Sequence, residues 1–266
     1  DIDLFSRVRV DGFYVEDHEQ DTLLYVSRAT AALKSLNIRE DGLLIRWAKA
    51  EDGVFNLREM QDGELNIRPI VRSLQKPNGK NNFYMLIEEI EAVNLGFRYE
   101  RLTHRNPEYG VDYGNMRIDD ISADVEQFHL QGTIVEGVVS NFKGREQSGF
   151  DVKSMSGRFH IDRGVVDLRD MYVQTEESEL SVEHLRLEAE DWTKYKYFIT
   201  SVDMLGVVIR SDVTRDDIAY FAPKMRSWKS GLDNAEIEFD GRVVDLNVNV
   251  KHAEFGDRSS FSGRVN

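Results

Sequence analysis

The chain has 266 residues, enough for one large β unit or two ordinary domains, and 41% of them are hydrophobic. Its formal net charge of −14 argues against binding to nucleic acid and against adhesion to an anionic membrane surface. The absence of cysteine excludes disulfide bridges, thiolate nucleophiles and cysteine-ligated zinc. No stretch approaches the roughly 20 apolar residues of a membrane-spanning helix, and no signal peptide is visible.

Apolar and polar residues alternate from the first ten residues onward, which is the pattern of β-strands with one apolar face. Clear examples are 93–100 (VNLGFRYE), 235–240 (AEIEFD) and 246–251 (LNVNVK). About fourteen such runs occur along the chain, a density that predicts a mainly β fold. The alternation continues to both ends of the sequence, so we expect the chain to be an internal piece of a longer protein.

Short pairs that contain glycine separate many of these runs. They are Asp11-Gly12, Asp41-Gly42, Asp52-Gly53, Asp62-Gly63, Asn78-Gly79, Arg163-Gly164 and Gly256-Asp257. Glycine, asparagine and aspartate tolerate the positive φ of tight hairpin turns, so we expect neighbouring runs to pair antiparallel. The alternation slips by one residue at Glu183-His184, which predicts a β-bulge there.

Two segments interrupt the β pattern. Residues 66–76 (NIRPIVRSLQK) place an N-cap asparagine before a first-turn proline, followed by apolar residues at helical spacing. Residues 214–225 (TRDDIAYFAPKM) begin with Thr214 three residues before Asp217, a weak capping box, and Pro223 limits the regular helix. We therefore expect two short helical insertions that cover an end or the apolar face of the sheet.

No group of residues forms a recognisable catalytic or metal-binding motif. The six histidines, none at a metal-ligand spacing, are His18, His104, His129, His160, His184 and His252. Asp119 and Asp120 are neighbours in a strand and point to opposite faces, whereas Asp216 and Asp217 fit the N-terminus of a helix. The sequence thus predicts no enzymatic activity, no bound metal and no cofactor.

The apolar face of these strands needs a cover. A closed barrel or a two-layer sandwich supplies that cover from protein, whereas an open, curved sheet leaves an apolar trough for lipid chains or an unfolded strand. Aromatic residues occur singly along the strands, which favours core or lining positions over a carbohydrate-binding platform. The alternation alone leaves both architectures open.

Several segments carry a family resemblance, and they occur in a fixed order along the chain. They are 8–24 (VRVDGFYVEDHEQDTLL), which ends in Asp-Thr-Leu-Leu, 66–74 (NIRPIVRSL), 93–99 (VNLGFRY), 110–112 (GVD), 146–150 (EQSGF), 175–180 (TEESEL) and 211–223 (SDVTRDDIAYFAP). Together they resemble the Bacteroidetes branch of the TamB (translocation and assembly module) proteins, within the AsmA-like, repeating β-groove group. Gln147 and Glu176-Glu177 are minor departures from the pattern.

The resemblance implies an elongated, twisted antiparallel sheet curled into a U-shaped groove (a β-taco) with an apolar interior. Residues 1–266 would form one continuous segment of that groove, with the helical insertions near 66–76 and 214–225. It further implies a periplasmic bridge that transfers phospholipid between the inner and outer membranes. Its expected partners are phospholipid acyl chains, a BamA-like outer-membrane barrel, and the inner membrane through an anchor outside this segment.

Strand phase, combined with the resemblance, predicts the residues that line the groove. They are Val8, Val10, Val93, Leu95, Phe97, Leu185, Leu187, Ala235, Ile237, Phe239, Leu246, Val248 and Val250. Two other functions stay open. One is assembly of outer-membrane proteins with the barrel partner, in which strand edges template an incoming strand. The other is carbohydrate binding by an adhesin-type β-sandwich.

Overall fold

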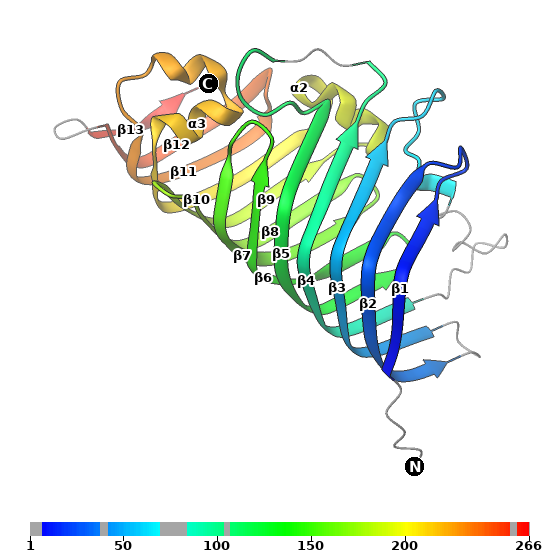
Figure 1. Cartoon of the computed structure of the whole chain (residues 1–266). Helices are drawn as coiled ribbons and strands as arrows, with labels where there is room; N and C mark the ends of the chain where they lie inside the picture. The colour runs from blue at the N-terminus through cyan, green and yellow to red at the C-terminus, as the bar shows by residue number, and fades with distance from the viewer. Residues whose placement is uncertain (1–6, 38–41, 70–83, 104–106, 256–259, 266) are drawn as a thin grey trace. The chain divides into compact units, whose positions relative to one another are not determined.

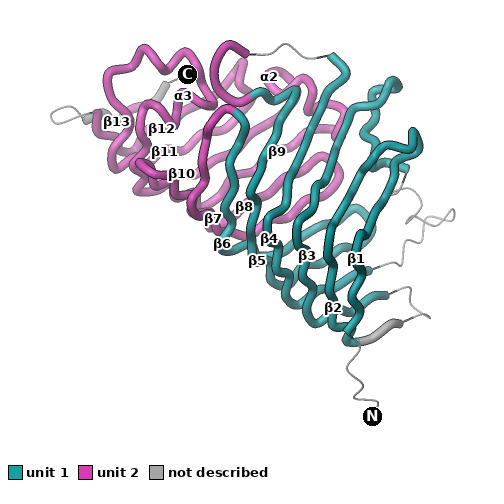
Figure 2. Tube along the Cα trace, viewed as in Figure 1, with its two compact units in different colours: residues 1–106, 112–147 teal, residues 107–111, 148–266 magenta. Residues whose placement is uncertain are grey.

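The computed structural model describes residues 7–37, 42–69, 84–103, 107–255 and 260–265. The chain forms two compact units (Figure 2): unit 1 comprises residues 1–106 and 112–147, and unit 2 comprises residues 107–111 and 148–266. Within each unit, strands that are consecutive in the chain are neighbours in the sheet. The predicted mainly β fold is confirmed.

Unit 1 is a curled sheet of six described strands (Figure 1). The strands are β1 (Arg7–Glu16), β2 (Thr22–Asn37), β3 (Gly42–Arg58), β4 (Tyr84–Glu100), β5 (Asn115–Gln131) and β6 (Ile134–Glu146). Among the described residues β1 pairs only with β2, and no pairing joins it to β6, so the sheet is not closed into a barrel. Figure 1 shows that the long strands bend along their length.

Unit 2 contains seven described strands and two helical insertions. The strands are β7 (Asp151–Asp162), β8 (Val165–Gln174), β9 (Glu179–Glu188), β10 (Asp203–Val213), β11 (Leu232–Arg242), β12 (Asp245–Glu254) and β13 (Ser260–Val265). The connection from β9 to β10 contains η1 (Trp192–Tyr197) and α2 (Phe198–Ser201), and the connection from β10 to β11 contains α3 (Arg215–Phe221) and η2 (Pro223–Ser227). In the described part of this unit, β13 pairs only with β12 and forms an open edge.

One strand pair departs from the predicted antiparallel arrangement. β3 and β4 run parallel, from Gly42 beside Tyr84 to Arg58 beside Glu100. A parallel pair needs a connection that returns the chain to the same end of the sheet, and residues 59–83 supply it. The other pairings described within the two units are antiparallel.

The predicted turns are confirmed at some positions and wrong at others. Asp62-Gly63 lies in a turn, and Arg163-Gly164 joins β7 to β8, both of its residues having positive φ (40° and 85°) as a tight hairpin requires. Asp11-Gly12 and Asp52-Gly53 lie inside β1 and β3, so the prediction of turns there is wrong. The pairs that lie wholly or partly outside the described residues are Asp41-Gly42, Asn78-Gly79 and Gly256-Asp257.

Interior residues in the left-handed backbone region bend most of the long strands. They are Gly12 in β1, Asp52 in β3, Asn94 in β4, Asp120 and Gln127 in β5, Asn141 in β6, Gly157 in β7, Asp170 in β8, Arg210 in β10, and Asn234 and Gly241 in β11. An extra residue of this kind makes a β-bulge, which bends the strand and shifts the alternation of its side chains by one position. In unit 1, Asn94 Nδ2 donates to Asp52 Oδ1 at 2.6 Å, joining the bends of two neighbouring strands. The preference for positive φ at Asp52 therefore serves a bend, not a reversal of the chain.

The two predicted helical insertions have different outcomes. The insertion at 214–225 is confirmed as α3 and η2, with the side chain of Thr214 accepting a hydrogen bond from the backbone N–H of Asp217 at 3.3 Å. The insertion at 66–76 begins with helical residues Arg68 and Pro69, and its continuation lies outside the described residues. The sequence did not predict η1 and α2, which are short and have no apolar periodicity of their own.

Candidate functional site

The apolar side chains of unit 1 lie in register across its strands. One row runs from β1 to β6 and consists of Val8, Ala31, Ala48, Ile90, Val125 and Val139. The next row consists of Val10, Ala29, Ala50, Ala92 and Ala123. Paired residues of neighbouring strands project from the same face, so these rows form one continuous apolar surface.

Unit 2 carries a comparable surface. One row from β7 to β12 consists of Phe159, Leu168, Leu185, Gly206, Phe239 and Val248, and the next consists of Ile161, Val166, Leu187 and Met204. The ring of Phe239 lies over Gly206, where an added Cβ would be 2.1 Å from a ring carbon. Glycine at this point lets a large aromatic ring lie flat against the neighbouring strand.

These apolar surfaces are only partly covered. None of the six residues in the first row of unit 1 is buried, and Val8 is 45% exposed. The extensive contacts between described elements of each unit join neighbouring strands, as in a single layer. The accessible surface of the chain is 16813 Å², whereas a compact globular protein of 30.7 kDa exposes about 12,000 Å². Within the described residues of each unit, the sheet is thus an open single layer that neither closes into a barrel nor packs against a second sheet of the same unit.

The opposite face of unit 1 carries the charges. Thr30, Lys49, Glu91, Asp124 and Ser140 form a row in register between the two apolar rows. Lys49 Nζ lies 2.9 Å from Glu91 Oε1 and 3.6 Å from Glu51 Oε1. The hydrogen bond to Glu91 raises the pKa of Lys49. Such ion pairs between strands hold the register from the solvent side.

On the corresponding face of unit 2, four side chains form a compact ionic cluster. Asp167, 7% exposed, accepts from Arg169 Nε at 2.9 Å and from Arg186 Nη1 at 3.3 Å, and its Oδ2 lies 3.0 Å from His184 Nε2. Burial alone would raise the pKa of Asp167, but the hydrogen bonds from Arg169 and His184 outweigh it and lower that pKa to about 2. His184 is thus a hydrogen-bond partner of Asp167 on the polar face of the strand.

The structure places most of the predicted lining residues on the apolar faces, each within its own unit. Unit 1 contributes Val8, Val10, Leu95 and Phe97, and unit 2 contributes Leu185, Leu187, Ala235, Ile237, Phe239, Leu246, Val248 and Val250. The register on β10 shifts beside Glu183, which confirms the predicted bulge at Glu183-His184.

Two of the lining predictions need correction. Val93 pairs with Glu51 and lies two residues from Glu91, so it belongs to the charged face. The bulge at Asn94 (φ 53°) separates it from Leu95, a shift that uninterrupted alternation in the sequence concealed. Ala235 lies on the apolar face but is only 1% exposed, so its side chain is not available to a ligand.

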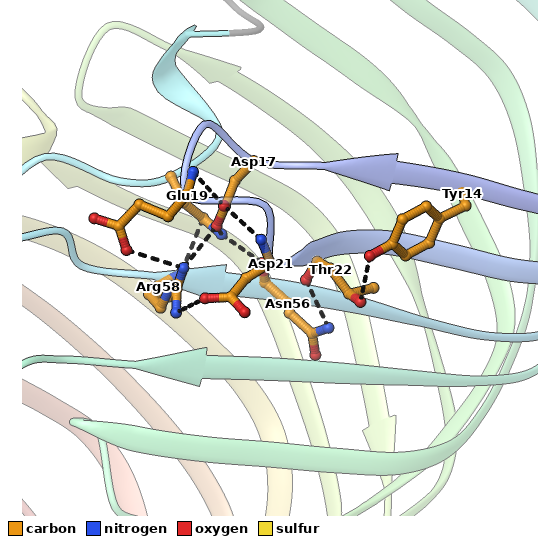
Figure 3. A network of polar contacts seen from close by, with 8 residues as sticks. Tyr14, Asp17, Glu19, Asp21, Thr22, Asn56 and Arg58 are labelled. Atoms are coloured by element: carbon orange, nitrogen blue, oxygen red, sulfur yellow. Dashed lines mark hydrogen bonds and ion pairs between the residues drawn. The ribbon is translucent and has the colours of Figure 1, made fainter.

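A buried polar cluster ties the β1–β2 turn to β3 (Figure 3). The Asp17 carboxylate accepts from Arg58 Nη2 at 2.9 Å and from Asn66 Nδ2 at 3.1 Å, and Arg58 Nη1 also contacts Asp21 Oδ2 at 2.5 Å. Burial alone would raise the pKa of Asp17, but hydrogen bonds led by that from Asn66 lower it. Asn66 is 1% exposed and also accepts from the backbone N–H of Arg58 and donates to the carbonyl of Asn56.

A second polar cluster joins two motif segments in unit 2. Thr175 Oγ1 donates to Asp217 Oδ2 at 2.6 Å, and it accepts from the backbone N–H of Ser178 at 2.9 Å. Ser178 Oγ in turn accepts from the backbone N–H of Thr214 at 2.9 Å. Residues of the motif segments 175–180 and 211–223 therefore fix a turn and the start of α3.

The described residues contain no group of three or more histidine, aspartate or glutamate side chains placed to hold a metal ion. Among the same residues, no helix has the length and apolar character needed to cross a membrane. In comparisons with known proteins, the chain matches no family model and no curated protein. The family relationship indicated by the ordered motifs therefore stays a proposal.

Proposed function

We propose that the chain is a segment of a periplasmic bridge whose apolar sheet faces hold phospholipid acyl chains during transfer between the inner and outer membranes. The observation that supports this best is the set of in-register apolar rows, most of whose side chains stay partly exposed on an open sheet in each unit. The ordered motifs that resemble TamB proteins support the same reading. As part of this proposal, an inner-membrane anchor outside the segment and a BamA-like barrel are the expected partners.

The physical basis of the proposal is the difference between the two faces of the sheet. Each methylene of an acyl chain that moves from water onto an apolar surface contributes about 0.8 kcal/mol. A charged head group cannot enter such a surface without losing its hydration, so it would stay in water beside the open sheet. The row of Thr30, Lys49 and Glu91 gives the other face no affinity for an acyl chain.

Adjacent valines on opposite faces allow a matched test. Val139 pairs with Val125 on the apolar face, whereas Val138 pairs with Glu126 on the charged face. In unit 2, Val208 pairs with Val182 and Ile237, whereas Val207 pairs with His184 and Glu238. A photocrosslinking amino acid should capture phospholipid from positions 139 and 208 but not from 138 and 207.

The crosslinking is to be done in cells, and the purified chain is to be extracted and its lipids identified by mass spectrometry. Phospholipid in the extract and face-specific crosslinks would support acyl-chain binding. Equal crosslinking from both faces, or a chain purified without lipid that takes up none from vesicles, would refute it.

A second candidate function is assembly of outer-membrane proteins by strand addition, and the exposure of β1 favours it. β1 is an edge among the described residues, and its Val8, Val10, Phe13 and Tyr14 side chains are 40–46% exposed. An edge of this kind can pair with an incoming strand through its free backbone groups. This function predicts crosslinks from β1 to barrel precursors, and none to lipid from Val139.

A further inference from the structure

One end of unit 2 carries an exposed apolar surface that the sheet rows do not include. We call it the strand-end patch, and its residues and exposed fractions are Trp192 (42%), Tyr197 (56%), Phe198 (37%), Ile199 (57%), Val243 (45%) and Val244 (62%). Single exposed apolar side chains are ordinary on a protein surface, whereas several that gather in one place are informative. The patch therefore indicates an interaction surface.

The patch is held together by defined contacts. The backbone N–H of Val244, in the β11–β12 turn, donates to the carbonyl of Ile199 in α2 at 3.3 Å. Arg242 Nη1 donates to the carbonyl of Thr200 at 3.4 Å, and Tyr195 Oη donates to the carbonyl of Leu187 at 3.2 Å. Two connections that are far apart in the sequence thus present their apolar side chains as one surface.

We propose that the strand-end patch docks unit 2 onto the surface of a phospholipid bilayer. Tryptophan and tyrosine are the side chains most enriched at the boundary between head groups and acyl chains, because their rings are apolar and carry a polar group. Phe198, Ile199 and Val244 supply apolar side chains that can enter the upper acyl region. Lys196 lies in the last turn of η1 with its Nζ 5.2 Å from the centre of the Tyr197 ring, so its stem can lie against the bilayer while its amine stays in water.

The local charge makes this end of unit 2 better suited to a bilayer surface than the rest of this acidic chain. Glu190 pairs with Lys194, and Asp203 pairs with Arg242 at 2.9 Å. Asp191 is held by the N–H and hydroxyl of Thr193. Residues 190–203 and 242–245, the two segments that carry the patch, contain three basic and four acidic side chains, against a net charge of −14 for the chain. Repulsion by lipid phosphates is therefore weak at this end, and docking depends on apolar insertion.

The size of the patch argues against a protein partner, including a second copy of the chain. Stable protein interfaces bury about 800 Å² on each side with 20–30 residues, whereas this patch has six apolar side chains. The patch also adjoins the end of an apolar row, since Tyr195 contacts the strand at Leu187. If the proposed function is correct, a lipid entering from the docked bilayer would meet the apolar face at once; the docking itself does not depend on that function.

The test is binding of the full chain to vesicles of phosphatidylcholine and phosphatidylethanolamine, measured by flotation. The double variant Ile199→Glu/Val244→Glu should lower the apparent partition coefficient at least about tenfold, since two inserting side chains become charged. The control Leu102→Glu/Tyr113→Glu changes two residues that are 55% and 56% exposed outside the patch, and it should bind like the wild type. Binding should also persist at high salt, because it is not driven by charge.

A fluorescence measurement reports insertion directly. In a chain with Trp47 and Trp228 replaced by phenylalanine, Trp192 emission should shift to shorter wavelength with vesicles and be quenched by lipids brominated near the head group. No vesicle binding by the wild type, equal binding by both double variants, or self-association lost only in the patch variant would overturn the proposal. Acyl-chain crosslinking from Val208 is measured separately, so docking and lipid holding can fail independently.

Discussion

Replacing Asn66 with alanine should strongly destabilise unit 1. The Asn66 side chain is 1% exposed and makes three hydrogen bonds: to the Asp17 carboxylate at 3.1 Å, to the Asn56 carbonyl at 3.1 Å and from the Arg58 N–H at 3.0 Å. A hydrogen bond to a charged group contributes about 1.5–3 kcal/mol and a neutral one about 1 kcal/mol. Because alanine leaves buried partners without a replacement, we expect the free energy of unfolding to fall by about 3–5 kcal/mol.

The measurement is urea unfolding followed by the fluorescence of Trp47, which lies on β3, in a chain whose other two tryptophans are replaced by phenylalanine. The matched control is Asn56→Ala, in the same cluster (Figure 3), because the Asn56 side chain makes one described hydrogen bond, to the Thr22 carbonyl at 2.9 Å. That control should cost about 1 kcal/mol. If Asn66→Ala costs no more than the control, the polar cluster does not stabilise unit 1 as argued.

Three further substitutions test other features. Asp167 has a pKa of about 2 in the fold against an ordinary 3.8, so the stability it gives the fold is complete above about pH 4 and is lost as the pH falls through 2. Asp167→Asn should therefore lower the free energy of unfolding by about 2 kcal/mol at pH 7. Urea titrations should show the difference between the two chains vanish as the pH falls from about 4 to 2. Asn94→Ala should cost about 1–2 kcal/mol and Asn94→Gly much less, since alanine resists the positive φ; equal losses in thermal unfolding would refute the backbone explanation. Gly206→Ala should cost about 1–3 kcal/mol by displacing the Phe239 ring, whereas Gly96→Ala, whose Cβ would meet the end of a flexible arginine at 3.3 Å, should cost less in the same assay.

The sequence predicted the class of the fold because its strands alternate strictly enough to define two faces. It also predicted α3, since Thr214 and Asp217 form a local capping contact. It could not predict the parallel pairing of β3 and β4, because the glycine-containing pairs indicate that the chain turns but not where the returning strand lies. Strand pairing depends on contacts between distant residues, which local patterns do not contain.

The candidate surface was predicted less completely than the fold, for a related reason. The phase of Val93 and Leu95 looks uninterrupted in the sequence, yet Asn94 changes it by adopting positive φ. The available signal for these bends was an asparagine or aspartate inside an apolar alternation. At Asp52 that signal predicted a turn, whereas the structure has a bend in β3. The strand-end patch gave no periodic signal, because its side chains come from a short helical connection and a two-residue turn that meet only in the folded unit.

The order of strands within each unit has a consequence for how the sheets form. When each strand pairs with the next one in the chain, most contacts close short loops, and folding can extend one strand at a time, as in repeat proteins. The exception in unit 1 is the junction between the parallel strands β3 and β4, because the connection of residues 59–83 must close before β4 can pair with β3. We therefore expect the β1–β3 part of the sheet and the β4–β6 part to form from local pairings, and the junction between them to form more slowly. The cluster around Asn66 lies at the start of that connection, where its hydrogen bonds fix the end of β3 to the β1–β2 turn.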